Sequence, residues 1–198
     1  MELPAPIFHR LRHFVPSILK DCISLRVINT YSYGFFIEFP CDDSAAASDG
    51  QAVAKWLFTP RPDNVPKVFK CYLDKDDANL TSKVEAFKTA FANASSPANF
   101  IVSIWFRYFA DFVVPFDQIN ELTREQLTLK RTDFHYCFLL VRCPIARDES
   151  KWTKWEEEAI DWQSYGQWNR ISICPIFVDD IGDGLLDEIP GPSDQQQK

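Results

Sequence analysis

Two histidines, His9 and His13, stand four residues apart, a spacing that places both imidazoles on one side of a helix and could hold a metal ion. The residues between them argue against that chemistry. Arg10 and Arg12 flank Leu11, so the glutamate of a metal-dependent hydrolase is missing and two positive charges repel a cation. We therefore predict no metal site but an exposed basic face, on which Arg10 and Arg12 are weak candidates for contact with an anion such as phosphate.

The remaining histidine, His135, stands two residues before Cys137 in an apolar run and would share its side of a strand. A cysteine and a histidine form a nucleophilic pair when the thiolate is exposed and a third group orients the imidazole. A buried, hydrogen-bonded histidine is the better interpretation here. Glycine-rich phosphate loops and the GxSxG motif do not occur in this sequence, which has 6 glycines. The sequence therefore predicts no catalytic residue and no cofactor.

Tryptophans are concentrated in the segment KWTKWEEEAIDWQSYGQW, residues 151–168. Trp152, Trp155 and Trp162 fall on one face of a helix together with Ala159, and Trp168 follows them. Tryptophan anchors many interfaces because it buries a large area at a small cost in side-chain entropy. Two interpretations stay open: the helix packs these side chains onto the sheet of its own domain, which we favour, or they bind a partner.

The negative charge of the chain is concentrated at its end. The 21 basic and 28 acidic side chains give a net charge of −7, of which residues 179–198 carry −5 and the preceding 178 residues −2. In this acidic segment Leu185, Leu186 and Ile189 are interleaved with acids, a pattern that suits a short amphipathic helix formed on binding to a basic-rimmed groove. The alternative is a solubilising terminus. We expect a flexible tail over 179–198 after a single globular domain over 1–178.

Hydrophobic periodicity predicts the elements that must position these residues. Helices are expected at 5–20 with a break at Pro16, at 82–94, at 117–127 and at 151–163. Strands are expected at 23–30 and 33–39, which would form a hairpin, and at 53–58, 67–73, 100–109, 134–141 and 171–178. The predicted fold class is therefore α+β, a single domain with a mostly antiparallel central sheet flanked by helices.

Over about residues 5–109 this order of elements resembles the core of the PD-(D/E)xK nuclease superfamily. The resemblance lies in element order and not in a motif. It implies an acid on the second strand, where Glu38 stands, and a further acid two residues before a lysine on the third. Lys55, Lys67 and Lys70 are each preceded at that distance by valine, so the metal site that such a hydrolysis needs is incomplete.

The preferred hypothesis is a non-enzymatic protein–protein interaction domain that uses the tryptophans and the acidic tail. A hydrolase-derived fold such as a degenerate nuclease, or a self-associating viral or host-interaction protein, are the alternatives. The charge distribution argues against nucleic acid as the partner, and the chain has no apolar run of membrane-spanning length. The missing signal peptide and the spacing of the 6 cysteines predict an intracellular protein, cytoplasmic or nuclear, with reduced thiols.

Overall fold

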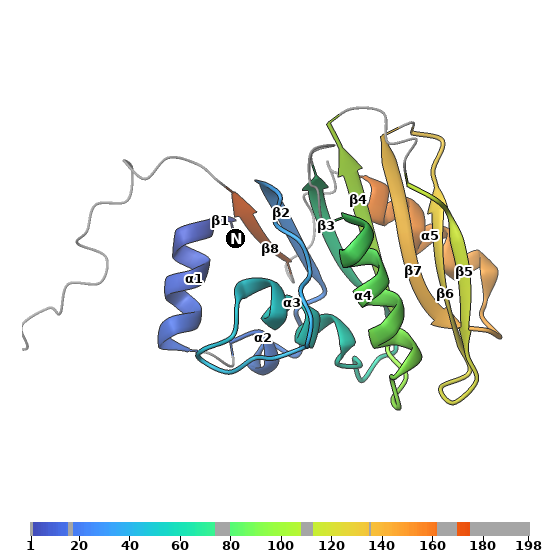
Figure 1. Cartoon of the computed structure of the whole chain (residues 1–198), viewed down its shortest axis with the longest axis horizontal. Helices are drawn as coiled ribbons and strands as arrows, with labels where there is room; N and C mark the ends of the chain where they lie inside the picture. Colours follow the sequence, from blue (N-terminus) through green and yellow to red (C-terminus); the bar gives the residue numbers. More distant parts are fainter. Residues whose placement is uncertain are drawn as a thin grey trace, which may run out of the picture.

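The computed structural model describes residues 2–15, 18–73, 80–107, 113–134, 136–161 and 170–174. Within these ranges helices lie on both faces of an eight-stranded sheet (Figure 1). The strands are β1 (Glu2–Pro4), β2 (Val27–Tyr33), β3 (Lys67–Leu73), β4 (Phe100–Phe106), β5 (Phe116–Asn120), β6 (Glu125–Arg131), β7 (Cys137–Pro144) and β8 (Arg170–Cys174). The helices are α1 (Ala5–Phe14), α2 (Ile18–Asp21), α3 (Asp49–Phe58), α4 (Leu80–Ala92) and α5 (Glu149–Ile160).

The sheet is mixed, which corrects the prediction of a mostly antiparallel one. Its order is β1-β8-β2-β3-β4-β7-β6-β5. The pairings from β1 to β4 are parallel, and those from β4 to β5 are antiparallel. The parallel half follows from the connections, because α3 joins β2 to β3 and α4 joins β3 to β4 as crossovers. The broader prediction of an α+β fold is confirmed.

Each face of the sheet carries its own core. On one face Phe8 of α1, Leu57 of α3 and Phe87 of α4 pack together with large side chains of the central strands. On the opposite face Trp152 and Ala159 of α5 pack against the sheet. Figure 1 shows α4 in front of the sheet and α5 behind it. The central strands β3 and β4 are buried on both sides, as the sequence predicts for residues 100–109.

The segment 53–58, predicted as a strand, lies in α3. Ser48 begins this helix with a capping box, in which its hydroxyl accepts from the Gln51 N–H and the Gln51 side chain accepts from the Ser48 N–H. Gly50 lets residues 36–38 lie against the first turn, since a Cβ there would come within 2.7 Å of the Phe36 carbonyl oxygen. This capping box precedes the apolar run of 53–58 and is the local signal that favours a helix there.

Two further predictions of elements are wrong. The hairpin of 23–30 with 33–39 does not form, because β2 continues to Tyr33 and pairs in parallel with β3 and β8. Gly34 does adopt the positive φ expected of a turn residue, at 80°. The helix predicted at 117–127 is the hairpin of β5 and β6 instead. Buried and half-buried residues alternate along most of β6, which is the two-residue period of a strand with one covered face.

The other elements agree with the sequence to within a few residues. The helix predicted at 5–20 is α1 followed by α2, with Pro16 outside the described residues; the helices predicted at 82–94 and 151–163 are α4 and α5. The five cysteines whose side chains are described are free thiols. No helix among the described residues is long and apolar enough to cross a bilayer.

A buried ion pair connects the antiparallel half of the sheet to the core under α4. Arg142 of β7 donates to the Glu125 carboxylate of β6 at 2.6 and 3.1 Å, and both side chains are 1% exposed or less. The second carboxylate oxygen accepts from the Ala98 N–H at 2.9 Å, and Arg142 also donates to the Ser96 carbonyl. The rings of Phe58, Phe91 and Phe100 surround the guanidinium at 5.2 to 5.8 Å.

Replacing Glu125 with glutamine should lower the free energy of unfolding by about 3 kcal/mol, because the Arg142 charge then stays buried without a counter-ion. Urea denaturation measures the change, with the exposed Glu121→Gln as control. The double variant Glu125→Leu/Arg142→Met should lose less than the single variant, since it removes both charges. A cost below about 1 kcal/mol for Glu125→Gln would contradict this account of the pair.

Candidate functional site

The face of the sheet that carries α5 is divided into three successive bands along the strands. The first band is apolar: Val27, Val68, Ile101 and Val141 lie in register across β2, β3, β4 and β7. Trp152 and Ala159 of α5 cover these side chains. Towards the carboxyl ends of the parallel strands the apolar band gives way to a row of polar side chains.

This polar row is Ser172, Asn29, Lys70 and Ser103, in register on β8, β2, β3 and β4 and each less than 5% exposed. The Lys70 ammonium donates to the carbonyl oxygens of Glu158 and Asp161 at 3.1 and 2.5 Å. These carbonyls belong to the last turn of α5, where the helix itself supplies no donor. Lys70 therefore fixes the point on the sheet where α5 ends.

The polar row is a structural seam and not a ligand pocket. Both amide atoms of Asn29 and the hydroxyl of Ser172 are buried and have no hydrogen-bond partner in the structure. The cavity beside Asn29 has a volume of about 10 Å³. That is the space of one water molecule, which suits the hydrogen bonding of these atoms and excludes a larger ligand.

Beyond the polar row lies an aromatic row, defined as Tyr31, Tyr72, Trp105 and Phe134. The centroids of neighbouring rings are 6.5, 6.4 and 6.0 Å apart in that order. Tyr72 and Trp105 are register partners on β3 and β4, and the Trp105 Nε1–H donates to Ser103 at 2.9 Å. Tyr31, Tyr72 and Trp105 are half-buried and Phe134 is 57% exposed, so the row presents rings at the carboxyl edge of the parallel strands.

An open groove of about 740 Å³ begins at the aromatic row and runs along one side of α5. We call it the α5 groove. Trp105 and Leu139 lie on the sheet side, residues 130–134 form one wall, and Thr153, Glu157 and Ile160 of α5 form part of the other. Four carboxylates and two cations line it, a net charge of −2: Asp133, Glu156, Glu157 and Asp161 against Lys130 and Arg131. The groove therefore combines apolar and aromatic side chains with an acidic wall.

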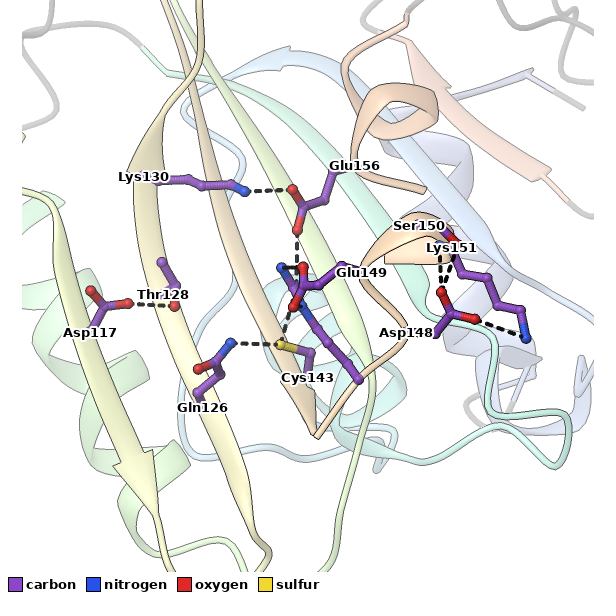
Figure 2. A network of polar contacts seen from close by, with 11 residues as sticks. Asp117, Gln126, Thr128, Lys130, Cys143, Asp148, Glu149, Ser150, Lys151 and Glu156 are labelled. Atoms are coloured by element: carbon purple, nitrogen blue, oxygen red, sulfur yellow. Dashed lines mark hydrogen bonds and ion pairs between the residues drawn. The ribbon is translucent and has the colours of Figure 1, made fainter. Parts of the chain in front are cut away.

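A network of polar contacts holds α5 against the outer strands and so fixes the acidic wall (Figure 2). Glu156 accepts from Lys130 of β6 at 2.5 Å and from Arg147 at 3.1 Å. The Cys143 thiol of β7 lies 3.4 Å from the Gln126 amide and 3.3 Å from Arg147. Burial raises the pKa of Cys143, although Gln126 and Arg147 oppose the shift. These contacts make Cys143 a packing thiol rather than a nucleophile.

The structure describes two of the four tryptophans that the sequence groups together. Trp152 is 4% exposed and contacts Trp155 edge-on with ring centroids 5.4 Å apart, while Trp155 is half-buried. Trp152 therefore packs onto the sheet of its own domain. The other predicted partner-binding residues lie outside the described residues: Trp162, Trp168, Leu185, Leu186 and Ile189.

The two candidate anion contacts are also placed differently from one another. Arg10 is exposed, but Arg12 is 3% exposed and forms an ion pair with Asp49 at 2.6 Å. Arg12 thus joins α1 to the first turn of α3. His9 and His13 are exposed, as the helical wheel predicts, and no three metal-ligating side chains gather among the described residues.

The remaining chemical candidates are engaged in structural contacts. Cys137 is fully buried and burial raises its pKa, which opposes formation of a thiolate; its neighbour His135 lies outside the described residues. Glu38 is exposed and accepts from the Ser48 hydroxyl at 2.5 Å beside the start of α3. A cluster of Glu38 with other acids in one cleft, which a nuclease site requires, does not form in the part of the chain that the structure describes.

Sequence reasoning missed the aromatic row. The sequence contains the information that places Tyr72 beside Trp105. The strands β3 and β4 are both seven residues long and begin side by side, and each of these residues occupies the sixth position. Using it requires knowing that the two strands are parallel neighbours. No family model, curated protein or solved structure matches the chain, so the site rests on its own geometry.

Lys70 gives the end of α5 a characteristic pH dependence. Burial lowers the pKa of Lys70 to about 8, with Asp161 opposing the shift and Arg170 and Arg26 adding to it. Between about pH 8 and about pH 10.4 the unfolded chain binds more protons at this lysine than the folded chain does, so the contribution of Lys70 to stability rises with pH.

The difference in unfolding free energy between the wild type and Lys70→Met should therefore increase over this range, as measured in urea at several pH values. The exposed Lys154→Met should show no such trend, and a flat difference for Lys70→Met would contradict the prediction.

Proposed function

We propose that this protein is a non-enzymatic protein-interaction domain that takes a segment of a partner protein into the α5 groove. The observation that carries the proposal is the aromatic row opening into a groove of about 740 Å³ with an acidic wall. Concave surfaces with partly exposed aromatic side chains are where binding energy concentrates in protein interfaces. The proposed occupant has an apolar or aromatic anchor flanked by lysine or arginine.

The charge of the groove supports a basic protein segment rather than a nucleic acid. Its net charge of −2 attracts lysine and arginine and repels a phosphate backbone. The acidic segment 179–198, with a charge of −5, adds a field of the same sign. Its Leu185, Leu186 and Ile189, and also Trp162 and Trp168, which follow α5 in sequence, remain proposed contributors to the same interface.

The self-association alternative is supported by a different observation at the far edge of the sheet. Strand β5 pairs with β6 on one side and ends the sheet on the other. Val114, Ile119 and Leu122 around it are 76%, 56% and 74% exposed. An open edge with apolar neighbours is a surface on which a second copy of the chain could add a strand. Light scattering of the purified chain separates this alternative from a monomeric adaptor.

Replacing Phe134 with alanine should weaken binding of the partner at least tenfold, because an exposed aromatic anchor is removed from the groove at little cost to folding. A random peptide library selected on the wild type gives the recognised motif, and titration of the selected peptides with Phe134→Ala measures this loss. We expect an apolar or aromatic residue flanked by lysine or arginine.

Ile119→Ala serves as the matched control, because Ile119 is equally exposed but lies on β5. A peptide that binds Phe134→Ala as well as it binds the wild type would contradict the groove proposal. Loss of binding or of an oligomer in Ile119→Ala alone would place the interface at the β5 edge instead.

Deletion of residues 179–198 should leave the unfolding transition unchanged but slow association with a basic partner and flatten its dependence on salt, because the −5 charge steers the encounter. Stopped-flow association at a series of ionic strengths measures both effects. Equal rates and equal salt dependence for the full and shortened chains would remove the tail from the interface.

A further inference from the structure

A second cavity, on the face of the sheet opposite the α5 groove, shares no lining residue with that groove. Its volume is about 120 Å³. It lies among α2, the outer side of α3, the loop 59–62 and the first residue of β3, in the region where Figure 1 shows α2 and α3 together. That volume is roughly ten times what a single water molecule needs. The cavity can therefore accept a small ligand.

The lining of this cavity is strongly basic. Four cations, Lys20, Lys55, Arg61 and Lys67, face one carboxylate, Asp43, for a net charge of +3 in a protein whose total charge is −7. Arg61 is held by two hydrogen bonds to Asp63, at 2.9 and 2.7 Å. Lys20 and Lys55 are exposed and form no ion pair within the described part of the chain. Arg61 is thus balanced by Asp63, and the positive charge available to a ligand comes mainly from the three lysines.

Lys67 is the cation at the base of the cavity, and its side chain is 5% exposed. Its ammonium donates to the carbonyl oxygens of Trp56 and Thr59, the second at 2.6 Å. An ammonium has three donors, so one N–H has no acceptor among the described residues. Burial, reinforced by the nearby charge of Arg61, lowers the pKa of Lys67 to about 8. A bound anion would satisfy the free donor and raise the pKa of Lys67 again.

Trp56 forms part of the wall of the cavity. Its side chain is 3% exposed and lines the cavity, and the Lys67 ammonium lies 5.1 Å from the centre of its ring. The Nε1–H of this indole is buried and has no hydrogen-bond partner. Because this nitrogen is closed to solvent, the indole contributes its ring to the cavity wall and no hydrogen bond to a ligand.

We propose that this cavity binds the phosphoryl group of a small phosphorylated molecule, with Lys55 and Lys67 as its donors. A tetrahedral oxyanion accepts hydrogen bonds in several directions, which matches donors that come from two elements. Ile23, Pro60 and Pro62 line the cavity as well and offer an apolar rim to the organic part of the ligand. This site is independent of the α5 groove, because the two are lined by different residues.

Isothermal titration calorimetry of the full chain with inorganic phosphate and with phenyl phosphate tests the proposal. The wild type should bind one equivalent of each, and phenyl phosphate should bind more tightly because its ring contacts the apolar rim. Lys55→Gln should weaken binding about tenfold, since it replaces a charge-assisted hydrogen bond with a neutral one. Lys154→Gln, which removes an exposed lysine on α5, should bind as the wild type does.

Each contrary result is informative. Absence of saturable binding to the wild type, or equal affinities in Lys55→Gln and Lys154→Gln, would overturn the site. Equal affinities for inorganic phosphate and phenyl phosphate would overturn the assignment of an organic ligand. Lys55 is exposed, so its substitution tests the site at little cost to folding.

Sulfate gives a test of Lys67 that avoids substituting a buried residue. The charge of sulfate is constant between pH 7 and pH 9.5, whereas Lys67 loses its proton in this range when no anion is bound. The groups that face Lys67 from neighbouring elements are Lys20, Lys55, Arg61, Asp43 and Cys22. The affinity of the wild type for sulfate should fall as the pH rises through about 8. In Lys55→Gln this fall should be smaller, because sulfate is bound more weakly and stabilises the Lys67 ammonium less. An affinity that does not change with pH would exclude Lys67 from the site.

Discussion

Two buried ammonium groups on β3 hold the C-terminal ends of α3 and α5. Lys67 and Lys70 are three residues apart on one strand, so their side chains leave it on opposite faces. Lys67 donates to the terminal carbonyls of α3 on one face, and Lys70 to those of α5 on the other. A cation at a helix C-terminus satisfies carbonyls that have no donor within the helix and opposes the negative end of its dipole. One central strand thereby sets the position of both helices that border the proposed sites.

The consequence is clearest on the α5 face. Because α5 ends at the polar row, it covers the apolar band but not the rings of Tyr72 and Trp105 further along the strands. Parallel strands present their carboxyl ends at this edge, the usual place for binding in open sheets of parallel strands. The network of Glu156 with Lys130 and Arg147 holds the side of α5 that faces the outer strands and orients its acidic residues along the groove. The groove thus results from the position at which α5 is held on the sheet.

Sequence reasoning found the elements whose signal is local and missed what depends on pairing. The apolar runs in β4 and β7 and the helical spacing in α4 and α5 suffice to identify them. The segment of α3 was misread because Val53–Phe58 is apolar at both parities, while the deciding signal, the capping box of Ser48 and Gln51, precedes it. Whether β2 pairs in parallel with β3 is set by a crossover outside either strand. The same holds for both candidate sites, since Trp105 and Phe134, or Trp56 and Lys67, come together through tertiary contacts alone.

The net charge of −7 says little about what such a fold attracts, because the sheet separates its charges. One face carries an acidic groove with a net charge of −2, and the other a basic cavity with a net charge of +3. Both lie within residues 1–178, whose charges sum to −2. Charges further apart than about 8 Å are largely screened at physiological ionic strength, so each ligand responds to the local group and not to the total. A basic segment and a phosphorylated molecule, which would compete for a uniformly charged surface, can therefore be recognised by the same small domain.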